Sequence, residues 1–157
     1  MRASALPLIL AAAIAVPGIA QADMLVGLAS ASGLKGFNIE KTWPSGSVYV
    51  LLGSYQSATG FEFENLTGII GFRRFQGAKS DASGYFGGAY AGDVDGGPDF
   101  NRYGAGGELG YQWVTDHLRI TMQAGMALAG ESSRGERQGG TELEPVPLLG
   151  ASISLRF

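Results

Sequence analysis

The sequence predicts an all-β fold class: a closed antiparallel transmembrane β-barrel, most simply of eight strands, after a cleaved signal peptide. Three observations favour this fold. Apolar and polar residues alternate with a period of two through the C-terminal half, which is the periodicity of a strand. Glycine supplies 26 of the 157 residues, and only 16% of residues are charged. Soluble domains average roughly 7% glycine and 25% charged residues, so the expected strands carry unusually few charges.

Composition also excludes several classes of protein. The chain has no cysteine, which removes disulfides, thiolate metal sites and cysteine nucleophiles. Its net charge of −3 does not suggest a nucleic-acid partner. The sequence contains no specific motif for a cofactor or a catalytic group, so we expect no cofactor and no enzymatic activity.

Residues 1–22 are expected to be a signal peptide and residues 23–157 the barrel domain. A positive residue near the start precedes an apolar run at 6–16, and the small residues Ala20 and Ala22 mark a cleavage site before Asp23. The alternative is an N-terminal membrane anchor, which is disfavoured because the run is too short for a ~30 Å hydrocarbon core. No later stretch approaches ~18 uninterrupted apolar residues, so membrane-spanning helices are excluded.

The first part of the barrel domain holds five expected strands. The pattern does not distinguish their two faces, because apolar residues occur at both parities. The earliest strand decides the strand count: without it the barrel would have seven strands, and bacterial outer-membrane barrels have an even number. The five segments lie at about 24–31, 34–42, 47–57, 66–75 and 84–92.

The last three strands, at about 103–113, 117–128 and 149–157, alternate clearly. A short polar connection at 114–117 predicts a hairpin between the first two. One parity of the second strand is entirely apolar, from Leu118 to Leu128, while the other holds polar and small residues. Connection lengths fit outer-membrane barrels, which have short periplasmic turns and longer outer loops. The connections at 43–46 and 114–117 are short, those at 58–65, 93–102 and 130–146 are longer, and 76–83 is long for a periplasmic turn.

The apolar faces have two candidate environments. A soluble sandwich or lipocalin-like barrel would turn them inward, whereas a membrane barrel turns them toward lipid. The opposite faces favour lipid, because they carry small residues such as Gly104, Gly106 and Ser152 rather than the Lys and Glu of a wet surface. Small residues suit a narrow lumen, where space between walls is limited.

A few long polar side chains share the small-residue faces and are candidates for ion pairs across the lumen. They are Glu108, Arg119 and Arg156, with Arg73 or Arg74 as a further partner. Buried charges need such partners. An eight-stranded barrel is about filled by its side chains, so interior packing is favoured over transport.

Aromatic residues lie at expected strand ends, as in the interfacial girdles of outer-membrane barrels. Trp43, Trp113 and Phe157 adjoin one end of the barrel, and Tyr103 adjoins the other. Aromatic residues also occur at the ends of soluble sheets, so this observation supports the membrane interpretation only together with the others.

The alternating C-terminal segment resembles the assembly signal of Gram-negative outer-membrane proteins, and Tyr103–Trp113 resembles a strand of small OmpA-like and uncharacterised outer-membrane β-barrel proteins. The resemblance implies location in the outer membrane, contact with its lipids and lipopolysaccharide, and recognition by periplasmic chaperones and the barrel-assembly machinery during biogenesis. The signal residues are Leu149, Ala151, Ile153, Leu155 and Phe157.

Other polar groups leave alternatives open. His117 is the only histidine and lies in a short connection, at the wrong end for the lipid-modifying barrels that use such a residue. Asp93, Asp95 and Asp99 form either a cation-binding loop or a solvated acidic loop. The segment 131–137 holds two arginines and two glutamates, which would either contact phosphate or form a mixed-charge loop.

These observations lead us to expect an integral outer-membrane barrel with a structural or surface-interaction role and a packed lumen. One alternative is a secreted, soluble periplasmic barrel that holds an apolar ligand. A lipid A-modifying outer-membrane enzyme is a less favoured alternative.

Overall fold

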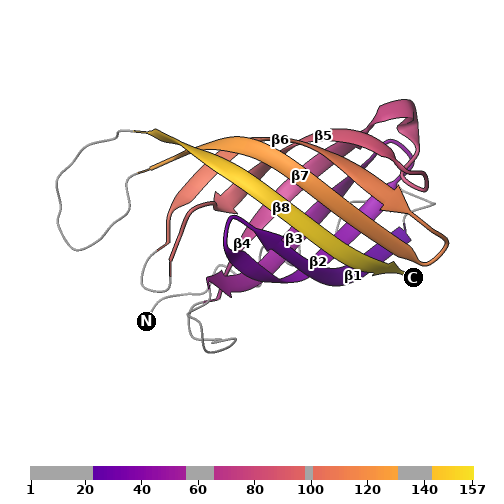
Figure 1. Ribbon diagram of the computed structural model, residues 1–157, viewed down its shortest axis with the longest axis horizontal. Helices are drawn as coiled ribbons and strands as arrows, with labels where there is room; N and C mark the ends of the chain where they lie inside the picture. Colours follow the sequence, from indigo (N-terminus) through magenta and orange to yellow (C-terminus); the bar gives the residue numbers. More distant parts are fainter. Residues whose placement is uncertain (1–22, 56–65, 98–100, 131–142) are drawn as a thin grey trace.

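The computed structural model describes residues 23–55, 66–97, 101–130 and 143–157, which form a closed antiparallel barrel of eight strands (Figure 1). This confirms the predicted all-β fold class, including the first strand, which fixes the strand count. The predicted signal peptide lies outside the described residues. Within the described part of the chain, no helix has the length and apolar character needed to cross a membrane. The strands are β1 (Asp23–Ala31), β2 (Leu34–Trp43), β3 (Gly46–Tyr55), β4 (Thr67–Phe75), β5 (Gly84–Asp93), β6 (Tyr103–Val114), β7 (Leu118–Ala129) and β8 (Glu144–Arg156).

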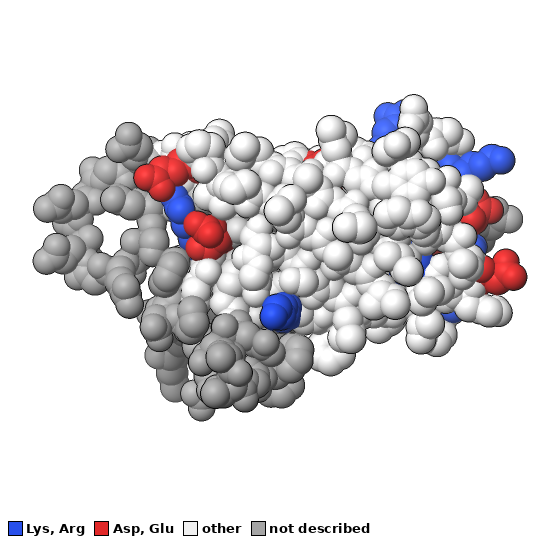
Figure 2. Space-filling model, viewed as in Figure 1, with Lys and Arg blue, Asp and Glu red and all other residues white. Residues whose placement is uncertain are grey.

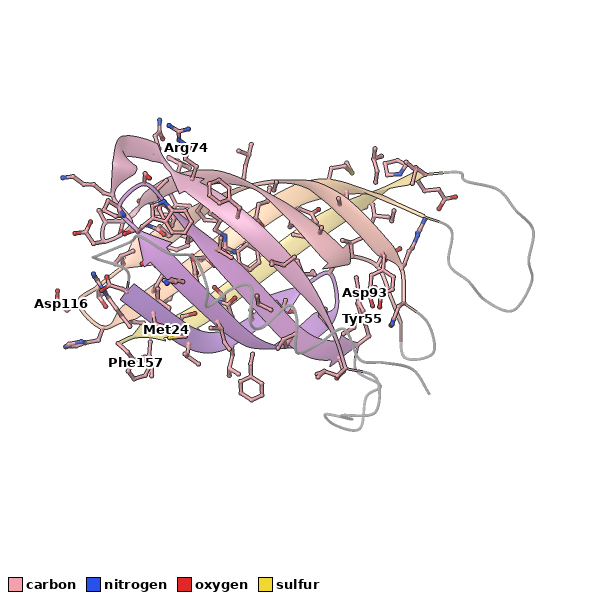
Figure 3. The ribbon with its side chains drawn as sticks, turned by 180° about the vertical axis from the view of Figure 1, so that it is seen from behind. Met24, Tyr55, Arg74, Asp93, Asp116 and Phe157 are labelled. Carbon is pink, nitrogen blue, oxygen red and sulfur yellow. The ribbon has the colours of Figure 1, made fainter. Side chains whose placement is uncertain are left out.

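The barrel has two different ends, which we call the turn end and the loop end. The turn end carries the connections 44–45, 76–83 and 115–117, and the loop end carries the remaining connections. Figure 3 labels Met24, Arg74, Asp116 and Phe157 at the turn end and Tyr55 and Asp93 toward the loop end. β1 closes the barrel against β8, and the backbone N–H of Phe157 extends this seam by donating to the carbonyl of Met24 at 3.0 Å.

Side chains of β6, β7 and β8 face as their alternation predicts. On β7, Arg119 and Thr121 are buried inside the barrel, whereas Met122 and Met126 are exposed on its outer wall. The same division holds on β8, where Ser154 is buried and Leu155 is exposed. Apolar side chains therefore line the outside of these strands and polar or small ones the inside.

β8 begins earlier than predicted, at Glu144 rather than Leu149, and contains two prolines. Proline cannot donate to a ladder, so it is tolerated where the strand edge has no partner. β8 pairs with β7 from Glu144 onward, but with β1 only from Gly150 onward. The carbonyl of Pro147 and the N–H of Leu149 both bond to the Ser32 hydroxyl, on the β1 side. Pro145 and Pro147 therefore occupy positions whose backbone points away from β7.

The barrel interior has two tiers. The tier toward the loop end is mainly apolar, and the tier toward the turn end is mainly polar and contains charged side chains. Buried residues of the apolar tier include Ala31, Leu34, Leu51, Ile69, Ala127, Ala129, Val146 and Leu148. Buried residues of the polar tier include Asn38, Glu40, Thr42, Ser47, Arg73, Glu108, Gln112, Arg119, Thr121 and Ser154.

One position breaks the alternation of β5. Gly92 has a φ of +146°, a conformation that side-chain-bearing residues rarely adopt, and a Cβ there would lie 2.3 Å from the carbonyl oxygen of Gly68. The break turns Asp93 inward, where it is fully buried, although its partner Tyr103 on β6 is exposed on the outside. Gly92 thus places a carboxylate at the loop end of the lumen.

Candidate functional site

A cluster of buried charges crosses the polar tier. The Arg73 guanidinium on β4 bonds to Glu108 on β6, with Nε 3.0 Å from Oε1, and to Glu40 on β2, with Nη1 3.3 Å from Oε2. Arg119 on β7 reaches the other oxygen of Glu40 at 3.2 Å. The cluster therefore holds two arginines and two glutamates, so its formal charge is zero, as buried ions require.

Neutral groups complete the coordination of these charges. The Tyr49 hydroxyl donates to Glu108 Oε2 at 3.0 Å, and the Arg73 guanidinium also donates to the Gln123 side-chain oxygen. The guanidinium carbon of Arg73 lies 4.0 Å from the centroid of the Tyr49 ring and 4.8 Å from that of Phe86, distances at which a cation is attracted to the ring face. Arg73 is thus held by groups from several strands at once.

The long connection at 76–83 covers the turn end of the lumen. The backbone oxygen of Ser80 accepts a bond from Arg119 Nη2 at 2.6 Å, and that of Ala82 accepts one from Gln112 Nε2 at 2.7 Å. The N–H of Ser80 donates to the carbonyl of Pro44 at 3.0 Å. The extra length of this connection, which we call the lid, lets its backbone accept hydrogen bonds from polar side chains buried in the lumen.

The apolar tier ends in a second set of polar contacts. The Tyr55 hydroxyl donates to the backbone oxygen of Asp93 at 2.9 Å. The backbone N–H of Arg102 donates to Asp93 Oδ1 at 2.9 Å, and its guanidinium forms ion pairs with Asp95 and Glu144. Burial lowers the pKa of Arg102, but the hydrogen bonds and charges of Glu144 and Asp95 outweigh it, so the pKa lies above its ordinary value. These contacts join the β5–β6 connection to the start of β8.

The lumen leaves little free space between the two tiers. A cavity of about 10 Å³ lies among Tyr49, Leu51, Arg73 and Gln123. A volume of ~10–15 Å³ holds roughly one water molecule. The residues around this cavity neutralise charge and pack together, and the cavity itself has no room for a ligand of several atoms.

The predicted lumen candidates have different positions. Glu108 and Arg119 lie inside the charge cluster, though they bond to different partners rather than to one another. Arg156 is partly exposed at the turn end, where it pairs with Asp23. Of the two alternatives at adjacent positions, Arg73 faces the lumen and Arg74 faces outward.

Sequence reasoning missed Glu40, which joins the two arginines, and Tyr49 and Gln123, which complete the cluster. The parity of 34–42 contained a usable signal for Glu40, because Asn38, Glu40 and Thr42 share one parity, whereas Phe37 and Ile39 share the other. Apolar Leu34 on the polar parity obscured that signal.

The outer wall carries the other residues selected from the sequence. Leu149, Ala151, Ile153 and Leu155 all point outward from β8, and Phe157 follows them at the turn end. Trp43 and Trp113 also lie at the turn end, and Tyr103 lies at the loop end. Trp43 packs on Phe72, with ring centroids 5.9 Å apart.

The remaining polar candidates lie partly within and partly outside the described residues. Among the described residues, no three His, Cys, Asp or Glu side chains are grouped so that they would hold a metal. His117 contributes its backbone oxygen to the N–H of Arg156 at 3.1 Å. Asp95 is engaged by Arg102, whereas Asp99 and the 131–137 segment lie outside the described residues.

In comparisons with known proteins, no protein-family model, no curated protein and no solved structure matches this chain.

Proposed function

We propose that this protein is an integral β-barrel of a Gram-negative outer membrane, with a structural or surface-interaction role and a lumen that is packed rather than conducting. In this proposal the turn end faces the periplasm and the loop end faces the exterior. The signal peptide directs export, and the C-terminal strand directs assembly.

The observation that carries the proposal is the distribution of charge over the outer wall. Among the outward-facing residues of the eight strands only Lys35, Lys41 and Arg74 are charged, and each lies within two residues of a strand end. Figure 2 shows one face of the molecule, on which charged residues gather mainly at the two ends and one basic side chain stands on the wall between them. A band of uncharged wall between charged ends matches the apolar band of membrane barrels.

Large apolar side chains fill that band. Leu109, Leu149, Met122 and Leu28 are more than half exposed, as are Phe37, Met126, Leu128 and Leu155. Soluble monomers rarely expose contiguous apolar patches above a few hundred Å². A soluble barrel that holds an apolar ligand would instead need an open apolar interior, whereas the described interior has a charged tier and a cavity of about 10 Å³.

Cell fractionation tests the proposal directly. The full-length chain, expressed in a Gram-negative host, is expected in the outer membrane, resistant to alkaline extraction and with faster migration on SDS gels when unboiled. A soluble periplasmic protein of the same host serves as the extraction control. Recovery of the chain in the soluble periplasm would overturn the proposal. The purified barrel is expected to give no steady conductance in a planar bilayer, and a stable open pore would contradict the packed lumen.

A further inference from the structure

The outer wall is not uniformly smooth. A hollow of about 700 Å³ crosses the outside of β5 to β8, lined by Tyr85, Leu109, Tyr111, Met122, Ala124 and Leu149 among others. A second hollow of about 490 Å³ adjoins it, shares Tyr85 and Leu109, and is bordered by Arg74. Both hollows are open to the surroundings, and their volumes fall within the ~300–1,000 Å³ that ligand sites usually have.

The strand register explains why the wall is hollowed here. Gly87, Leu109, Ala124 and Leu149 form one row of paired outward positions across the four strands. The next row toward the turn end consists of Tyr85, Tyr111, Met122 and Ala151. Each row mixes large side chains with glycine or alanine, so the groove runs between the rows and is widened where the small residues lie.

The groove has a direction that suits a membrane lipid. Tyr85 is the second residue of β5, at the turn end, whereas Leu149 lies near the middle of β8. Arg74 lies beside the Tyr85 end and points away from the wall (Figure 3). Arg74 has no ion pair among the described residues. A guanidinium matches phosphate geometry and forms strong charge-assisted hydrogen bonds with it.

We propose that this groove binds one glycerophospholipid, with its phosphate on Arg74 and an acyl chain between the two rows of side chains. The proposal rests on the proposed function, because it requires the outer wall to face lipid. It commits to the leaflet at the turn end, since Arg74, the cation that borders the groove among the described residues, lies there.

Fluorescence quenching in detergent micelles tests the proposal. Trp113 is a suitable reporter because its ring lies 4.9 Å from that of Tyr111, which lines the groove. The chain has two tryptophans, so Trp43→Phe leaves Trp113 alone. Phosphatidylglycerol with brominated acyl chains is expected to quench Trp113 saturably at one lipid per chain. Brominated diacylglycerol, which lacks the phosphate, is expected to bind roughly tenfold more weakly or worse, since hydrogen bonds to charged groups are the strong ones.

Matched variants locate the site. Arg74→Gln is expected to weaken phosphatidylglycerol binding roughly tenfold or more. Lys41→Gln, which removes an outward charge at the same end but on another wall, is expected to change it less than twofold. Ala124→Phe fills the groove and is expected to reduce binding, whereas Ala105→Phe, outward on β6 but outside the groove, is not.

Quenching that rises linearly without saturation would overturn the proposal, as would equal effects of Arg74→Gln and Lys41→Gln or no effect of Ala124→Phe. These outcomes differ from failure of the proposed function, in which the wild-type chain would not enter the outer membrane at all.

Discussion

Replacing Leu109 by arginine provides a sharp measure of what surrounds the barrel. Leu109 lies at the middle of β6, points outward and is 73% exposed, so the substitution removes little internal packing. Its neighbours across the ladder, Gly87 and Ala124, leave space for a longer side chain. Any large effect must therefore come from the surrounding solvent rather than from the protein interior.

The expected magnitude depends on depth. Arginine on the lipid face costs about 2–4 kcal/mol at the bilayer midplane and about 0–1 kcal/mol near the interfaces. Leu109→Arg should then reduce the free energy of unfolding by about 2–4 kcal/mol. Leu155→Arg, outward near the end of β8, should cost about 1 kcal/mol or less. On a water-exposed wall both changes would remain within about 0.5 kcal/mol.

The assay is reversible unfolding of the refolded barrel in phospholipid vesicles, titrated with urea or guanidinium and followed by tryptophan fluorescence. Both variants should retain the wild-type dependence of unfolding free energy on denaturant, so that the midpoints report stability alone. Equal, near-zero effects of Leu109→Arg and Leu155→Arg would refute a lipid-facing wall. An equal large loss in both would indicate damage to the fold rather than dependence on depth.

Three further predictions follow from the interior and from the chain end. Glu108→Leu should destabilise the barrel by about 3–5 kcal/mol, because Glu40 alone then faces Arg73 and Arg119 and the cluster keeps one uncompensated buried charge. Adding Arg73→Met should restore most of the loss in the same assay, and a double variant worse than the single one would contradict this. Gly92→Ala should lower the free energy of unfolding by at least about 1 kcal/mol, because Gly92 has a φ of +146° and lies close to the Gly68 carbonyl. Gly84→Ala is the control, since a Cβ there has no atoms within 4 Å, and its loss of stability should be clearly smaller. Deletion of Phe157 should lower the amount of barrel in the outer membrane with little change in stability after refolding in vitro, and normal membrane levels would argue against an assembly signal.

The sequence predicted β6, β7 and β8 well because their two faces differ in kind. On these strands the outward parity is almost wholly apolar and the inward parity is polar or small, so alternation alone separates them. The faces of β2, β3 and β4 could not be separated in this way, because the loop-end tier places Leu34, Leu51 and Ile69 inside the barrel. Apolar residues then occur on both faces of these strands, so the sequence pattern alone did not identify Glu40 as an inward-facing residue.

The lid required information that no local pattern contains. Residues 76–83 have an ordinary turn composition, and only their length was unusual. Their role depends on Arg119 and Gln112, which reach them from β7 and β6 and which lie about thirty or more positions away along the chain. The boundary of β8 was missed for a related reason: proline normally ends a strand, but here β1 stops short and leaves that edge without a partner.

The glycine excess is a packing requirement of the narrow lumen. A Cβ at Gly71 would lie 2.3 Å from the Tyr49 ring, and a Cβ at Gly110 would lie 2.4 Å from the Phe86 ring. These are the two rings that flank the Arg73 guanidinium. Gly71 is the ladder partner of Tyr49 on β4, and Gly110 is that of Phe86 on β6, so each ring can pack over the neighbouring strand only because glycine occupies the paired position. Glycine at these paired positions makes room for the rings and the charge cluster inside the barrel. The charged side chains therefore lie in the interior and not on the middle of the outer wall.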